Sequence, residues 1–158
     1  MKMICVRHSL RRFIRNDRGT QLIELAIVLP VMLILLSGIA EFGRYFYTYT
    51  TLSKAARAGA RYMSTKSYVN TEKAKAENYV VYGKISPGAG DKPVISGFTV
   101  DNVDITTPDG FANATDPVTI RVSIDYNYTP IFNLGGLIGF NWVSVPVRPT
   151  MTIRYLVV

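Results

Sequence analysis

Cysteine and histidine are almost absent from this chain of 158 residues, in which Cys5 and His8 are the single examples. One cysteine cannot form an intrachain disulfide. Both residues also precede Gly19, so a chain cut after Gly19 would hold neither of them. Zinc sites built from cysteine and histidine, and catalytic triads that need a histidine base, are therefore excluded from the processed form.

Acidic residues are also sparse, and no group of them has the spacing of a metal site. Five aspartates are scattered among turn residues of the C-terminal half: Asp91, Asp101, Asp104, Asp109 and Asp116. They lack the D-x-[DN]-x-[DN]-G spacing of a calcium-binding EF-hand loop, so we interpret them as solvated loop and cap residues. We therefore expect no metal, no cofactor and no small-molecule substrate.

The positive charge of the chain is concentrated at its N-terminus. The formal net charge is +7, but residues 1–19 hold six basic residues against Asp17 alone, a net of +5. From Thr20 onward, twelve basic and ten acidic residues leave only +2. A nucleic-acid-binding surface needs positive charge clustered on the folded part. We therefore attribute the charge to a basic leader that stays in the cytoplasm, and we expect no nucleic-acid partner.

A short junction follows this leader, and Gly19, Thr20 and Glu24 are its distinctive residues. A glycine before the bond, a carboxylate five residues later and an apolar run beyond form the pattern that a prepilin peptidase reads, which predicts cleavage between Gly19 and Thr20. Glycine leaves the backbone at the bond unobstructed. An ionised acid costs about 2.5–3.5 kcal/mol at the bilayer centre, so Glu24 indicates a function, and the new amine at Thr20 is its nearest candidate partner. The alternative places Glu24 in the headgroup region of an ordinary signal anchor.

Residues 25–40 contain no charged side chain and predict a single membrane-spanning helix. Because helix of this length extends only about 24 Å, apolar neighbours on both sides must complete a hydrocarbon core of about 30 Å. A secretory signal peptide is the rival interpretation, but no A-x-A-like cleavage site follows the apolar run. Pro30 removes a helical hydrogen bond and predicts a kink. The basic leader predicts a protein of the cytoplasmic (inner) membrane with its N-terminus inside and residues 65–158 extracytoplasmic.

Beyond residue 40 we expect the helix to continue as an amphipathic stem, because apolar side chains recur at three- and four-residue steps. Basic residues follow on another face: Lys54, Arg57 and Arg61. Two pairs of small residues stand four apart, Ala55 with Gly59 and Ala56 with Ala60. Such pairs let another helix or a sheet approach closely. These small residues could pack on a second subunit or on the chain's own domain, or alanine could be present only because it favours helix.

The remaining residues predict a second helix and then a sheet. The helix follows an interruption at residues 67–70, is capped by Asn70 or Thr71, runs to about residue 82 and ends at Gly83. The apolar period then changes to two, which predicts strands. They cover residues 98–105, 118–128, 143–147 and 151–155.

Two details of this region remain open from the sequence. Pro146 and Pro149 predict a bend or a bulge in the strand at 143–147. The connection at residues 130–140 is unusually apolar for a loop, so we expect it to contact membrane, a partner or the core. Together, the elements predict an α+β fold, in which a long N-terminal membrane helix continues as a stem packed on a small antiparallel sheet. The expected divisions are residues 1–19 (leader), 20–64 (helix and stem) and 65–158 (extracytoplasmic domain).

Three segments of the helix and stem are specific as a set. They are RGTQLIELAIVLP at residues 18–30, EFGR at 41–44 and AARAGAR at 55–61. With them the chain resembles the TadE-like family of pseudopilins of tight adherence (Flp-type) pilus systems, over about residues 11–63. The segments YNYTPIF at 126–132 and MTIR at 151–154 are more loosely similar.

This resemblance implies cleavage by the prepilin peptidase of the system, an envelope location and a role in pilus biogenesis. It also implies partners among other pilins, pseudopilins and pilus assembly proteins, and it implies no catalytic residues. We expect Pro30, Glu41, Gly43 and Arg44 to take part in helix packing together with the small-residue pairs.

Two functions fit these observations. In the first, the chain is a structural pseudopilin whose helix packs beside other helices, and Glu24 neutralises an N-terminal amine, which offsets the desolvation of both charges only in good geometry. In the second, it is a membrane-tethered binding module that never enters a filament. An enzyme is disfavoured because the processed chain lacks histidine and cysteine.

Overall fold

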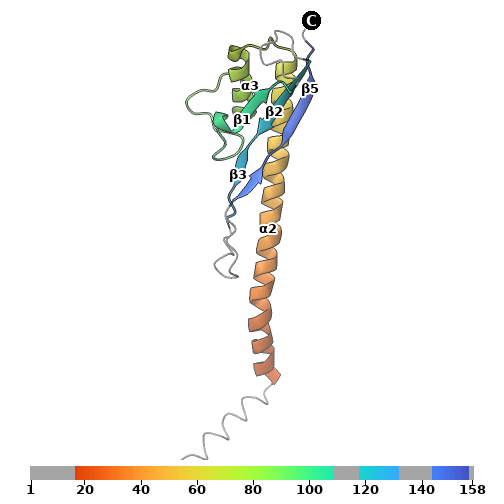
Figure 1. Ribbon diagram of the computed structural model, residues 1–158. Coiled ribbons are helices and arrows are strands. Elements are labelled where there is room, and N and C mark those ends of the chain that lie inside the picture. The colour runs from red at the N-terminus through yellow and green to blue at the C-terminus, as the bar shows by residue number, and fades with distance from the viewer. Residues whose placement is uncertain (1–16, 109–117, 132–143, 157–158) are drawn as a thin grey trace, which may run out of the picture. The chain divides into compact units, whose positions relative to one another are not determined.

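The computed structural model of the chain describes residues 17–108, 118–131 and 144–156, with side chains from residue 19 onward. The described elements are α2 (Asp17–Ser64), α3 (Asn70–Tyr82), the 3-10 helix η1 (Val100–Asn102), β1 (Val103–Thr106), β2 (Thr119–Ile124), β3 (Tyr126–Tyr128), β4 (Val145–Val147) and β5 (Thr150–Arg154) (Figure 1). They confirm the expected α+β class. The chain divides into two compact units between Phe42 and Gly43, so α2 contributes to both.

Helix α2 is 48 residues long and holds the apolar run and the stem in one element. Its N-terminal part is long and apolar enough to cross a membrane, with a mean hydropathy of 2.6 in the apolar window. Pro30 lies inside the helix, and the kink expected there stays a prediction. The helix ends at Ser64, whose hydroxyl donates to the carbonyl oxygen of Arg61 at 2.8 Å. This bond serves one of the last carbonyls, which lack helical partners.

Helix α3 ends as expected but begins differently. Gly83 follows its last residue with φ 68°, and the Gly83 N–H donates to the Tyr79 carbonyl oxygen at 2.9 Å, which confirms the glycine stop. The expectation that Asn70 or Thr71 caps the first turn is wrong. The N-cap is Val69, whose backbone is extended and whose side chain has no hydrogen-bond acceptor. Asn70 and Thr71 already lie within the helix.

Three strands form an antiparallel sheet in the order β1-β2-β5. The register pairs Ile105 with Val122 and Val122 with Met151. In β2 the alternate side chains Ile120, Val122 and Ile124 are buried, as the period of two predicts. The expected strand at 98–105 is shorter in the structure, because the Asn102 side chain accepts the Thr99 N–H at 3.0 Å and closes η1 before β1 begins.

The single strand expected at 118–128 is divided into β2 and β3, and β3 pairs with β4 in a second sheet. The pairs Ser123–Thr150 and Tyr126–Val147 show that the register continues across the break. The break is therefore an interruption of the ladder without an inserted residue, so no bulge is present between these strands.

Asp125 and Pro149 explain this interruption. The Asp125 N–H donates to the Asn102 carbonyl oxygen at 2.8 Å, and the Asn102 side-chain amide donates to the Asp125 carbonyl oxygen at 2.9 Å. The backbone of Asp125 is thus diverted from the ladder. Pro149 lies at the break, where its carbonyl oxygen accepts the Ile124 N–H at 3.1 Å but it cannot donate a backbone hydrogen bond in return. Pro146 lies within the ladder of β3 and β4.

The core of the second unit is formed where the last part of α2 packs on α3 and the sheets (Figure 1). Its fully buried side chains include Leu52 and Met63 from α2, Val80 from α3, and Ile120 from β2. The segment after β5 is bonded to the same helix, because the Leu156 N–H donates to the Ser64 carbonyl oxygen at 2.9 Å. Most of the apolar connection at 130–140 lies outside the described residues.

Candidate functional site

The expected cleavage site lies at the beginning of α2. Helix α2 starts at Asp17, so Gly19 and Thr20 belong to its first turn, and the bond between them is helical rather than extended. Thr20 is exposed. The residue that follows the expected cleavage point is therefore accessible.

Glu24 stands four residues after Thr20 on the same helix, and both residues are exposed. Residues four apart are neighbours on a helix surface. If the chain were cut before Thr20, the new amine would lie about one turn from the Glu24 carboxylate.

The apolar side chains that follow have no cover within their own unit. Leu22, Ile27, Leu33, Ile39 and Phe42 are between 57% and 71% exposed. Soluble proteins rarely leave so large an apolar surface uncovered, and such a surface marks contact with a membrane or another protein. This exposed run gives α2 the length and the apolar composition that a membrane span needs.

The expected helix-packing residues near the boundary of the two units have different surroundings. Pro30 and Gly43 are exposed, and a Cβ atom added to Gly43 would meet no atom within 4 Å. Arg44 places its guanidinium 6.0 Å from the ring centroid of Tyr128 in β3. Glu41 is half-buried. Packing of these four residues on another subunit stays a prediction.

The small residues of the stem are used inside the chain. Ala56 and Ala60 are buried in the core, Ala55 is half-buried beside it, and Gly59 is buried. A Cβ atom added to Gly59 would overlap the Val80 Cγ2 atom of α3. The close approach of α2 and α3 therefore requires glycine at this position, and these residues have a role in the second unit whether or not another subunit also contacts the stem.

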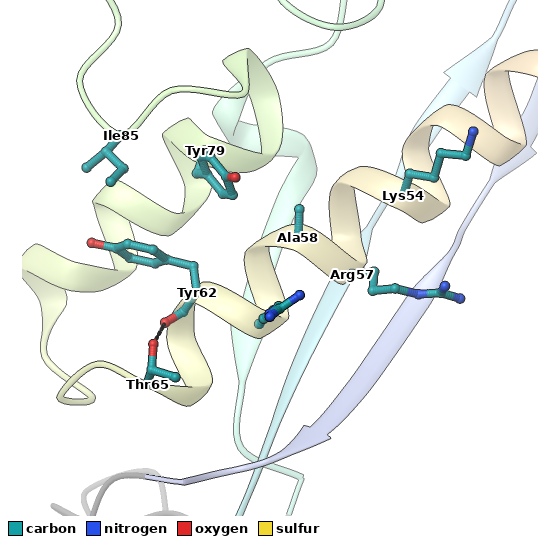
Figure 2. A pocket seen from close by; sticks show the side chains of 8 residues that line it. Lys54, Arg57, Ala58, Tyr62, Thr65, Tyr79 and Ile85 are labelled. Atoms are coloured by element: carbon teal, nitrogen blue, oxygen red, sulfur yellow. Dashed lines mark hydrogen bonds between the residues drawn. The ribbon is translucent and has the colours of Figure 1, made fainter.

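A groove beside the stem was not anticipated from the sequence. It has a volume of about 570 Å³ and is lined by Lys54, Arg57, Ala58, Arg61, Tyr62, Thr65, Tyr79 and Ile85 (Figure 2). The basic residues were visible as one face of the stem, but nothing in the sequence showed that Tyr79 of α3 would lie next to Tyr62. Their ring centroids are 6.0 Å apart.

Titratable groups in the second unit serve structural roles. The Lys75 ammonium and the Tyr62 hydroxyl both donate to Glu72 at 2.7 Å, and they hold the pKa of that carboxyl below its ordinary value. Burial raises the pKa of Glu77. Across the ranges that the structure describes, no three His, Cys, Asp or Glu residues gather in a group that could hold a metal ion.

Comparison with known proteins finds one family model that is similar to a part of the chain. Residues 19–61 match the family model of the TadE-like protein, which confirms the resemblance over the apolar helix and the stem. The match begins at Gly19 and includes Thr20, Glu24, Gly59 and Ala60. Neither the curated proteins nor the solved structures contain a match to this chain.

Proposed function

We propose that this chain is a pseudopilin that acts in assembly of the pilus while anchored in the membrane. Its N-terminal helix is similar to that of a TadE-like, pilin-like protein associated with tight adherence pili. The observation that carries the proposal is the uncovered apolar run of α2, placed directly after Gly19, Thr20 and Glu24. A plain soluble domain has no use for such a surface.

In this proposal the prepilin peptidase removes the leader by cutting between Gly19 and Thr20. The apolar helix then stays in the inner membrane, and the second unit lies outside the cytoplasm. Side-by-side packing with the helices of other pilins or pseudopilins would desolvate the N-terminal amine. Glu24 would neutralise that amine, either on its own chain or on a neighbouring one, because a buried ammonium without its counter-charge costs about 3–5 kcal/mol.

A tethered binding module that does not enter a filament is the second candidate. One observation favours this candidate. The core of the second unit is built from residues after Gly43 and needs no part of the apolar run. This candidate shares the anchor and the cleavage, and differs in whether the helix assembles with others.

Cleavage is tested by N-terminal mass analysis of the protein extracted from membranes. Gly19→Leu should leave the leader attached, because a bulky side chain obstructs the backbone at the bond. Gly38→Leu is the matched control, since Gly38 is also a glycine of α2 with no atom near its missing Cβ. A wild-type N-terminus beyond residue 40 would identify an ordinary secretory signal peptide and overturn the proposal.

Assembly is tested with Glu24→Gln, which keeps the shape of the side chain and removes its charge. We expect the variant to be cut and inserted normally, since the ionised acid is the costly group in lipid. We expect its crosslinking and copurification with pilus components to fall at matched expression. Unchanged assembly would favour the tethered module over the pseudopilin.

A further inference from the structure

Three basic side chains of the stem have no carboxylate partner in the described part of the chain. Lys54, Arg57 and Arg61 are exposed, and none takes part in an ion pair or a side-chain hydrogen bond with the described residues. Other basic residues of the same unit are paired. Lys75 lies 2.7 Å from Glu72, Lys84 lies 2.6 Å from Asp91, and Arg148 lies 3.2 Å from Asp125. Among the residues that the structure describes, the stem therefore presents positive charge without a carboxylate partner.

These cations adjoin an aromatic surface. Positions three and seven residues apart extend about 10 Å along one side of a helix, so the three charges form a row. Figure 2 shows Tyr62, Tyr79 and Ile85 gathered on the α3 side of the groove, with Lys54 and Arg57 placed further along α2. The Tyr62 hydroxyl donates to Glu72 at 2.7 Å, which holds that ring in place. Ile85 is 41% exposed.

We propose that this groove is a docking site for an acidic segment of another protein of the envelope. Carboxylates of the segment would pair with Lys54, Arg57 and Arg61, and one apolar or aromatic side chain would lie against Tyr62, Tyr79 and Ile85. Arginine presents a planar fork that binds carboxylates through two hydrogen bonds, and aromatic side chains are frequent at the centre of interfaces. Charge complementarity selects the acidic partner.

The position of the groove along α2 favours a protein over lipid headgroups, and this step depends on the membrane anchor of the proposed function. Arg44 is the first charged residue after Glu41 at the distal end of the apolar run. Lys54 follows ten residues later, about 15 Å along the helix axis. The headgroup layer on each side of a bilayer is only about 5–8 Å thick. The row of cations therefore begins beyond the reach of the lipid phosphates.

The experiment places a photoreactive benzoyl-phenylalanine at Ile85 of the full chain in its native cells. We expect irradiation to join Ile85 to a protein segment that contains several carboxylates, with the site mapped by mass spectrometry. Arg57→Gln/Arg61→Gln should lower the yield about tenfold, as expected for the loss of two exposed charge pairs. Lys92→Gln/Arg154→Gln removes two exposed charges elsewhere in the unit and should leave the yield unchanged.

A charge exchange makes the test specific. Arg57→Glu should abolish the crosslink, and a lysine substituted for the facing carboxylate of the partner should restore it. A crosslink to lipid, to a second copy of this chain or to a segment without carboxylates would overturn the proposal. So would the absence of any crosslink, or equal yields from the two double variants. Leader cleavage measured in the same cells separates the two proposals: normal cleavage with a negative crosslink rejects the groove alone, whereas failed cleavage rejects the pseudopilin.

Discussion

The apolar side chains of helix α2 are exposed in its first part and buried in its last part. Before the unit boundary at residue 42, Leu22, Leu33 and Ile39 are more than half exposed. After it, Leu52 and Met63 are completely buried, because α3 and the sheets cover this part of the helix. One continuous helix therefore carries an apolar surface that needs a partner from outside the chain and another that has its partners within it.

The difference in exposure follows from how apolar side chains are distributed around the helix. The first part is apolar around its circumference, which is the pattern of a helix surrounded by apolar material. The second part is amphipathic, so only one side needs cover and the opposite side can carry Lys54, Arg57 and Arg61. Stability of the second unit and insertion of the first should respond to separate sets of substitutions.

The largest expected effect is in the core of the second unit. Phe98 is 1% exposed, and Phe98→Ala should lower the free energy of unfolding by about 3–5 kcal/mol through lost burial and a cavity. Leu33→Ala removes apolar surface from a side chain that is 57% exposed, and should leave the unfolding of the second unit unchanged. Thermal unfolding of both variants in detergent checks the prediction. Equal destabilisation would mean that the two units do not unfold independently.

The next effect is on membrane insertion. Leu33→Arg places a charge within the apolar run and should disfavour insertion by about 2.5–3.5 kcal/mol. Leu33→Phe, at the same position, should insert normally. The measurement is the fraction of protein that resists carbonate extraction from membranes. Full insertion of the arginine variant would show that this part of α2 is not in lipid.

A smaller effect is expected at the contact of α2 with α3. Gly59→Ala should destabilise the second unit by about 1–3 kcal/mol, because its Cβ overlaps the Val80 side chain. In the double variant with Val80→Ala, the overlap is relieved, so the total loss should be smaller than the sum of the two single losses. Denaturant unfolding of the three variants gives the coupling. Simple additivity would show that Gly59 is not required by the close packing.

The smallest effect concerns pH and the loop after α3. The Lys84 ammonium and the Gly88 N–H hold the pKa of Asp91 below its ordinary value of 3.8. A carboxyl with a lowered pKa in the folded state stabilises the fold above its unfolded pKa and loses this contribution as the pH falls toward the folded value. Asp91→Asn should therefore reduce stability slightly at neutral pH and have a smaller effect below pH of about 3.8. The control is Lys92→Gln, which removes a neighbouring exposed charge and leaves the Lys84–Asp91 pair in place, so its stability should keep the pH dependence of wild type.

Much of the fold could be predicted from local patterns, and the errors have both local and long-range causes. The two helices and the glycine stop at Gly83 follow from periodicity and from the left-handed backbone that glycine permits. The division of the strand at Asp125 could not be predicted, because it depends on hydrogen bonds to Asn102, more than twenty residues earlier in the chain. The helix cap was misassigned because two polar residues follow Val69 and each resembles a capping residue.

The amino-acid sequence alone identified the apolar run, the basic leader and the spacing of Gly19, Thr20 and Glu24. Each of these features depends only on composition and on short distances along the chain. Tertiary structure decided which side of the stem is covered. It brought Gly59 against Val80 and Tyr79 next to Tyr62, and it left Arg57 without a carboxylate partner among the described residues. Contacts of this kind join segments that no local pattern relates, so the groove exists only in the folded second unit.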